Sequence, residues 1–398
     1  MRMRYSLIVS LFSISLLSGC STLSSLNPFG EKLEVMAPVP EFAAEFSQRQ
    51  IWEKSVGKGS GEYFSTLRPA HDNGTIYAAD RQGTVMAIDA TSGNTIWEIQ
   101  LAESVGLLSS RKSALLSGGV SVYNNRVYIG SERGILYSID SATGQLIWEV
   151  QAAGEIVARP TIEKDKIMLV TTNGKLQVLN IADGTEVWRA DLDVPVLSLR
   201  GQSSPITVED KFVIVGGDNG RINAFTFDLG QLVWQERVAE PLGATEIDQL
   251  GDIDAQPVFH NGILYAIAFN NMLVAFDFNS GEALWRAEYG SIRDFIVTDD
   301  VIYLTDQNDH IYALNTSDYQ LIWKQDGLNK RFVTAPALVG NNIVVADGEG
   351  YVFWLNKQTG AFVASEQLDR SGFVADPLTV NTKVILQARK GSVYAIER

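Results

Sequence analysis

The segment 83-GTVMAIDATSGNTIWEIQ-100 contains the pattern that decides the fold. Its first part, 84-TVMAID-89, is apolar at both alternating parities, which predicts a β-strand covered on both faces. A short turn of small and polar residues follows, and Trp97 comes four residues after the turn glycine Gly93. The segment therefore predicts two antiparallel strands joined by a hairpin and packed between neighbouring sheets.

Both parts of this segment recur along the chain, so an internal repeat is the first feature to establish. The glycine-to-tryptophan spacing returns at Gly144…Trp148, Gly184…Trp188, Gly230…Trp234 and Gly281…Trp285. Trp323 follows Tyr319 in a weaker copy, and Ala364 replaces the aromatic residue after Gly360. The apolar strand occurs eight times, as 83-GTVMAID, 134-GILYSID, 174-GKLQVLN, 220-GRINAFT, 271-NMLVAFD, 309-DHIYALN, 350-GYVFWLN and 391-GSVYAIE.

Two more β-rich runs precede each apolar strand. The nearer run is exemplified by 75-TIYAAD, 212-FVIVGG and 301-VIYLTD, and the farther one is short and often begins with proline, as at Pro69 and Pro160. Each unit thus has four short strands in about 44 residues, which is the size of one β-propeller blade.

The incomplete first and last copies of the repeat predict a closed ring. The last copy stops at Arg398 after its third strand, while the first strand of the chain, Gln50–Lys54, carries an unaccompanied Trp52. Pairing the N-terminal strand with the C-terminal blade would remove both free edges. We therefore expect an all-β, eight-bladed β-propeller of four-stranded antiparallel blades; the alternatives are a solenoid or two β-sandwiches.

The first twenty residues have the form of an export signal. Arg2 and Arg4 precede the apolar run Tyr5–Leu17, which is too short to span a bilayer. The sequence 17-LSGC-20 resembles the lipobox of bacterial lipoproteins, which implies acylation of Cys20, and Ser21 in place of Asp implies the outer membrane. We expect a signal peptide at 1–19, a lipidated N-terminus with a flexible tether at 20–45, and the propeller at 46–398.

Composition excludes several functions. The formal net charge is −15, with 32 basic and 47 acidic residues, so no nucleic acid partner is expected. A single cysteine and three histidines offer little for a zinc site. The chain also lacks G-x-S-x-G and H-E-x-x-H elements. We expect no catalytic residues, no metal and no cofactor.

Three long links between blades indicate which face of the propeller is functional. They are Leu101–Leu116, Leu192–Ser204 and Ala239–Ala255, and the repeat places all of them on one face. Apolar anchors beside an arginine on one link, and acids on the next, suit protein recognition. In the alternative interpretation, the leucines only fill the blade tops and the acids cap turns. The candidate partner-binding residues are Leu197, Leu199, Arg200, Asp252 and Asp254.

The Gly-x-x-x-Trp element is similar to the repeat of pyrroloquinoline-quinone enzymes, which makes a quinone-binding enzyme a rival hypothesis. Those enzymes bind calcium in a central funnel, and many carry adjacent cysteines, which this chain lacks. Asp252, Asp254 and the segment 217-GDN-219 would offer oxygen ligands to calcium.

Lipobox, tether and propeller together resemble the BamB family of the outer-membrane β-barrel assembly (BAM) machinery. Shared segments are 116-LSGGVSV, 196-VLSLRG, 216-GGDNGR, 293-RDFIV and 348-GEGYVFWLN. The resemblance implies a non-enzymatic, lipid-anchored subunit on the periplasmic face of the outer membrane of a Gram-negative bacterium. It also implies docking on the POTRA domains of BamA, through the five residues above, to assist folding and insertion of outer-membrane β-barrel proteins. A lipoprotein that binds glycan or another envelope partner, and direct contact with unfolded clients, stay open.

Overall fold

A computed structural model describes residues 35–398 apart from Phe64, Thr66, 103–111, Arg200, 241–249 and 270–271. Met36–Arg398 form one compact unit, and every regular element in its described residues is a β-strand. No helix in this part of the chain is long and apolar enough to cross a membrane. The signal peptide, Cys20 and Arg200 lie outside the described residues.

Thirty-two strands are present in the described residues, and they fall into eight four-stranded antiparallel sheets. Blades 1 to 4 consist of β2 (Ala70–Asp72), β3 (Thr75–Ala79), β4 (Thr84–Asp89), β5 (Thr95–Gln100); β6 (Leu116–Tyr123), β7 (Arg126–Ser131), β8 (Ile135–Asp140), β9 (Leu146–Gln151); β10 (Thr161–Glu163), β11 (Lys166–Thr171), β12 (Lys175–Asn180), β13 (Glu186–Asp191); and β14 (Ile206–Val208), β15 (Phe212–Gly216), β16 (Arg221–Thr226), β17 (Leu232–Arg237).

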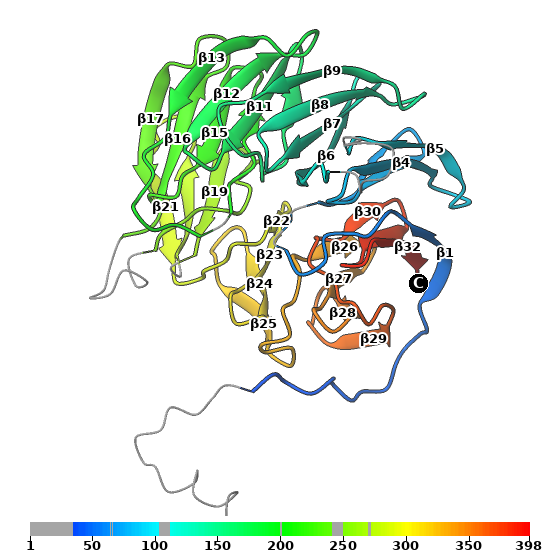
Figure 1. Ribbon diagram of the computed structural model, residues 1–398. Helices are drawn as coiled ribbons and strands as arrows, with labels where there is room; N and C mark the ends of the chain where they lie inside the picture. Colours follow the sequence, from blue (N-terminus) through cyan, green and yellow to red (C-terminus); the bar gives the residue numbers. More distant parts are fainter. Residues whose placement is uncertain are drawn as a thin grey trace, which may run out of the picture. The chain divides into compact units, whose positions relative to one another are not determined.

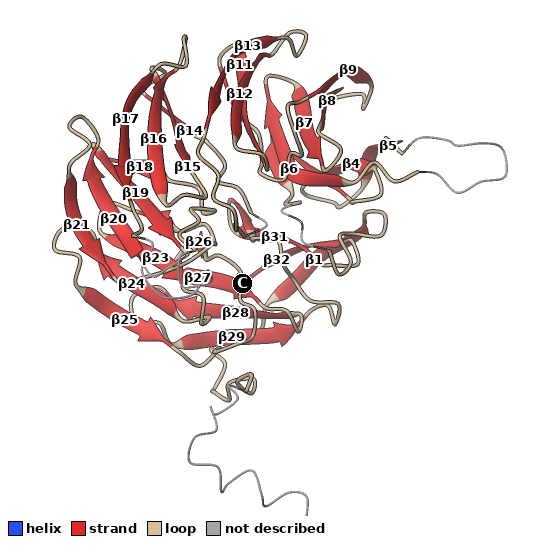
Figure 2. Cartoon of the chain, turned by 60° about the vertical axis from the view of Figure 1, so that its left-hand side comes forward, coloured by secondary structure: helices blue, strands red, loops and turns tan. Residues whose placement is uncertain are grey.

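Blades 5 to 8 consist of β18 (Val258–His260), β19 (Ile263–Ala268), β20 (Met272–Asp277), β21 (Ala283–Ala287); β22 (Ile296–Val297), β23 (Val301–Thr305), β24 (Ile311–Asn315), β25 (Leu321–Gln325); β26 (Ala337–Val339), β27 (Asn342–Ala346), β28 (Tyr351–Asn356), β29 (Phe362–Gln367); and β30 (Leu378–Val380), β31 (Lys383–Gln387), β32 (Ser392–Glu397), β1 (Arg49–Ser55). The blades surround a common axis (Figure 2).

The ring closes through the two ends of the chain. Strand β1 pairs antiparallel with β32, with Trp52 opposite Ala395 and Ser55 opposite Ser392, and Figure 1 shows the two strands side by side. The predicted eight-bladed propeller, with its N-terminal strand completing the last blade, is confirmed. The third strands are buried on both faces as predicted: the four central residues of β4 are at most 3% exposed.

The repeated tryptophan lies on the outermost strand and docks against the next blade. Trp97 donates from Nε1 to the Ser141 carbonyl at 2.8 Å, and Trp52, Trp188 and Trp323 make the equivalent bond to the following blade. The turn glycine of that blade lies against the indole, because a Cβ on Gly144 would lie 2.8 Å from Trp97 Cδ2. The Gly-x-x-x-Trp spacing is therefore a blade-to-blade packing device.

A bulge precedes the tryptophan position in all eight blades. The register between the third and fourth strands skips one residue there, as between Ala87 and Ile88 in blade 1. Since a bulge re-aims the neighbouring side chain, it turns the tryptophan inward and its predecessor outward. In blades 1 to 6 the predecessor is an aliphatic residue that is 41–54% exposed: Ile96, Ile147, Val187, Val233, Leu284 and Ile322.

The two departures from the repeat have structural explanations. Tyr319, in place of the turn glycine, adopts φ 58° and stacks on Trp285 with ring centroids 4.4 Å apart. Ala364, in place of tryptophan, faces a blade whose third and fourth strands come from opposite ends of the chain, so no turn is there to dock against. Trp354 is fully buried instead, with Phe46 edge-on and a hydrogen bond of 2.9 Å to Gln48.

Candidate protein-docking site

One face of the ring carries the eight blade-to-blade links together with the turns between second and third strands; we call it the link face. Because neighbouring strands alternate in direction, both kinds of connection must leave from the same end of each blade. The described parts of the three long links lie on this face. Residues 103–111, 241–249 and Arg200 lie outside the described residues.

The link from blade 3 to blade 4 presents leucine side chains to solvent. Leu197 is 43% exposed, its neighbour Val196 is fully exposed, and Leu199 is half-buried. The Leu199 N–H donates to the Asp252 carboxylate, which belongs to the next long link. The structure thus brings together the two segments that the sequence singled out.

The acids of the second link lie inside rather than on the surface. Asp252 is fully buried, and Asp254 is half-buried with its carboxylate where a Cβ on Gly201 would be. Any side chain larger than hydrogen at Gly201 would displace that carboxylate. Asp252 and Asp254 therefore hold the leucine-bearing link in place.

Asp218 joins these two acids, and the three carboxylates lie within 4.8 Å of one another. It comes from the β15–β16 turn and accepts from Gln202 Nε2 at 3.1 Å. Burial raises the pKa of Asp218, and burial with the Asp218 charge raises the pKa of Asp252 to about 6. Burial, reinforced by both neighbours, holds the pKa of Asp254 well above its usual range. A proton shared within this cluster relieves the repulsion.

Comparison with known proteins bears on what this face binds. The family model described as "Outer membrane protein assembly factor BamB" matches residues 106–325 and 317–398. Outer membrane protein assembly factors BamB from Yersinia pestis and Escherichia coli are 45% and 43% identical over 398 residues, covering all of both chains.

The chain belongs to the BamB family.

Solved structures agree with this membership. BamB from Moraxella catarrhalis superimposes with a TM-score of 0.78 at 26% identity, covering 88% of this chain and all of that one.

A second family model, for the β-propeller domain of glucose, ethanol and alcohol dehydrogenases, matches residues 45–166. A quinohemoprotein alcohol dehydrogenase from Pseudomonas putida has a TM-score of 0.66 at 14% identity, covering 88% of this chain and 76% of its own, and shares the fold alone.

The carboxylate cluster does not fit calcium, the metal expected if the chain were a quinone-binding enzyme. Calcium takes six to eight oxygen ligands. Among the described residues, Asp218 is engaged by Gln202 and one Asp252 oxygen by Leu199, leaving one oxygen without a hydrogen-bond partner on each of Asp252 and Asp254. In the described residues the cluster contacts the leucine-bearing link instead, through the hydrogen bond from the Leu199 amide to Asp252.

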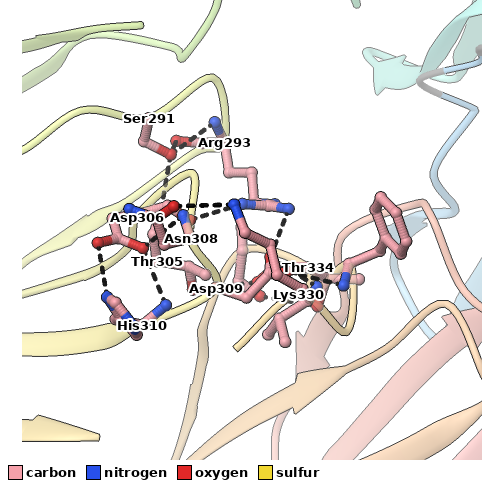
Figure 3. A network of polar contacts seen from close by, with 12 residues as sticks. Ser291, Arg293, Thr305, Asp306, Asn308, Asp309, His310, Lys330 and Thr334 are labelled. Carbon is pink, nitrogen blue, oxygen red and sulfur yellow. Dashed lines mark hydrogen bonds and ion pairs between the residues drawn. The ribbon is translucent and has the colours of Figure 1, made fainter. Parts of the chain in front are cut away.

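Sequence reasoning missed an apolar rim at the centre of the link face. Ile292, Phe332 and Val374, from three links, are exposed and are among the residues that line a cavity of about 290 Å³. Figure 3 shows how Asp309 holds this region: it accepts from Arg293 Nη2 at 2.8 Å and from the Phe332 and Val333 amides at 2.8 and 3.0 Å. The 68% exposure of Phe332 is a structural result, because the sequence offers no periodicity there.

Proposed function

We propose that this protein is a non-enzymatic scaffold subunit of the BAM complex. Its link face docks on the POTRA domains of BamA, and the complex folds and inserts outer-membrane β-barrel proteins. The observation that carries the proposal is an exposed leucine on a link that is hydrogen-bonded to the next long link, in a chain whose full-length relatives are named assembly factors.

The chemistry of docking follows from the placement of the candidate residues. Leu197 supplies apolar burial at the centre of the contact, with Val196 beside it. Arg200, the next residue after Leu199, supplies a charge-assisted contact with an acidic group of the partner. Asp252 and Asp254 act through the link that they hold, since Asp252 is buried beneath it.

The proposal includes location at the periplasmic face of the outer membrane. Export by the signal at 1–19 and acylation of Cys20 would anchor the propeller by lipid alone. Several acyl chains at about 0.8 kcal/mol per buried methylene suffice for stable attachment. With no metal or cofactor assigned, the protein would act by binding only.

Co-purification with BamA from solubilised envelopes tests the docking face. Leu197→Asp and Arg200→Glu are each expected to reduce recovery of BamA at least fivefold, since truncation of a central anchor costs above about 1 kcal/mol. The thermal midpoint of the Leu197→Asp variant should not change, because Leu197 is exposed, and the same midpoint is required of Arg200→Glu for its loss of BamA to count.

Val187→Asp is the matched control. Val187 lies on the outermost strand β13 and is 44% exposed, nearly the same as Leu197, so it tests exposure of an aliphatic side chain away from the link face. Full recovery of BamA with Leu197→Asp, or equal loss with Val187→Asp, would contradict the proposal.

A further inference from the structure

Residues Met36–Gln48 form a strap across the outside of the propeller. Glu45 donates its N–H to the Val363 carbonyl at 2.8 Å, and Phe42 stacks on Phe362 with centroids 5.5 Å apart. Val363 occupies the bulge position that is 41–54% exposed in blades 1 to 6, yet it is only 2% exposed. The strap therefore buries one apolar position that six other blades leave open.

A buried cation fixes the start of the strap. Arg331 is 2% exposed; its Nε donates to Asp347 at 2.7 Å, and its Nη1 donates to the Ala37 carbonyl at 2.8 Å. The Ala37 N–H in turn donates to the Asn329 carbonyl at 2.9 Å. Removing the strap would leave one Arg331 nitrogen without its partner, which is costly for a buried charge.

The strap has a direction. Asn329 and Arg331 belong to the link between β25 and β26, so the strap begins on the link face. It ends at Gln48, directly before Arg49 of β1, which pairs with Glu397 at the end of β32 farthest from the link face. Strand β1 then returns to the link face at Ser55. The first residues of the strap, Met36 and Ala37, therefore lie at the link face.

We propose that the strap makes the link face the side of the propeller that faces the lipid bilayer. The inference rests on the proposed acylation of Cys20, from which only 16 residues, 20–35, precede the strap. A flexible segment of that length has an r.m.s. reach of about 22 Å. A globular unit of this size is roughly 50 Å across. The reach of residues 20–35, which we call the leash, is therefore shorter than the width of the propeller. Such a short leash keeps the part of the propeller to which it is attached toward the membrane.

Electrostatic attraction to the bilayer does not orient the propeller, so its orientation depends on the leash. The chain carries a formal net charge of −15, so an anionic bilayer repels it rather than adsorbing a particular face. Without the strap, the leash would lengthen to residue 48 and emerge from the opposite face. The strap thus brings the proposed docking face within reach of partners that lie close to the bilayer.

Fluorescence resonance energy transfer from a label on the protein to a labelled lipid tests this orientation in the full-length, lipidated protein. Cys20 is the only cysteine, so after acylation one introduced thiol is the only label site. Lys390→Cys, in the β31–β32 turn, labels the link face, and Thr382→Cys, in the β30–β31 turn of the same blade, labels the opposite face. In vesicles containing an acceptor headgroup lipid, we expect higher transfer efficiency from position 390 than from 382.

Variants of the strap provide the second comparison. Val39→Ser with Phe42→Ser should free the first part of the strap and reduce the difference between the two labels, while Phe46 and Gln48 still complete the core of blade 7. Glu41→Ser, at an exposed strap position, is the control and should preserve the difference.

The experiment distinguishes failure of the orientation inference from failure of the proposed lipid anchor. Equal transfer from both positions, or higher transfer from 382, in vesicle-bound protein would overturn the role of the strap and leave the lipid anchor standing. If the protein does not float with vesicles, and Cys20→Ala behaves identically, the proposed anchor itself is wrong and the orientation inference falls with it.

Discussion

The carboxyl group of Asp252 is fully buried beside two others, those of Asp218 and Asp254. In the described residues, one oxygen of this carboxylate accepts from the Leu199 amide and the other has no hydrogen-bond partner. A buried charge with so few partners costs stability unless it takes up a proton. The residue therefore combines a positioning role for the proposed docking link with an energetic cost to the fold.

Asp252→Asn should stabilise the protein at neutral pH and have little effect at low pH. The pKa of Asp252 rises from 3.8 to about 6 on folding. The contribution of this carboxyl group to the free energy of unfolding is therefore fully present below about pH 4, and it is lost as pH rises toward 6. Asparagine keeps the acceptor for Leu199 and removes the charge. We expect a gain on the order of 1–3 kcal/mol at pH 7.5, measured by thermal unfolding at pH 4.5 and 7.5.

Asp347→Asn is the informative counterpart. Asp347 is equally buried, but it pairs with the Arg331 guanidinium at 2.7 Å, so removing its charge leaves a buried cation unpaired. We expect this variant to lower the thermal midpoint at neutral pH. If both variants shift the midpoint in the same direction at pH 7.5, the electrostatic account of Asp252 is wrong.

Among the elements, the hairpin between third and fourth strands explains most of the repeat. Its glycine is needed twice, once for a positive φ and once because the indole of the preceding blade occupies the space of a Cβ. The two requirements are separable, because other glycines in the fold have the first without the second.

Gly144→Ala and Gly74→Ala separate these requirements. Both glycines have nearly the same φ, 75° and 78°, but a Cβ on Gly144 meets Trp97 at 2.8 Å while a Cβ on Gly74 meets nothing within 4 Å. Both variants lose roughly 1–2 kcal/mol to the left-handed backbone, and Gly144→Ala should lose roughly 1–3 kcal/mol more to overpacking. Denaturant unfolding measures the difference, and equal losses would show that the indole contact contributes nothing.

The elements differ in how far the sequence predicts them. Blades, closure and tryptophan docking follow from a repeat that is visible without any alignment. The strap shows no periodicity, and its partners Asn329, Arg331 and Val363 lie about 300 residues away in sequence. Residues 36–45 were expected to belong to a flexible tether, whereas in the structure Val39 and Phe42 pack against blades 6 and 7.

The candidate site was predictable in part for the same reason. Exposed leucines in a link longer than its counterparts stand out from the repeat, and Leu197 is exposed as its position suggested. Acidic residues in loops are ordinarily solvated, so nothing in the sequence of Asp252 indicates burial. Burial arises because the β15–β16 turn and two links converge, which depends on the three-dimensional arrangement of blades 3 to 5.

For the whole molecule, closure depends on one pair of strands. Blades 1 to 7 are each built from consecutive strands, whereas blade 8 joins β1 to β32 across the full length of the propeller. Opening that pair exposes the edges of both strands and the strap that leads into β1. Unfolding should therefore begin at this seam, because it has the largest loop entropy to gain.

A disulfide across the seam tests this expectation. Ser55→Cys with Ser392→Cys, opposite each other on β1 and β32, would close almost the entire ring in one covalent loop, and Lys175→Cys with Asp191→Cys would bridge the equivalent positions of blade 3. Chain entropy predicts gains of about 6 and about 3 kcal/mol respectively. Measured as reductant-sensitive shifts of the thermal midpoint in a Cys20→Ser background, the seam bridge should give the larger one. An equal or smaller shift would mean that unfolding starts within a blade rather than at the closure.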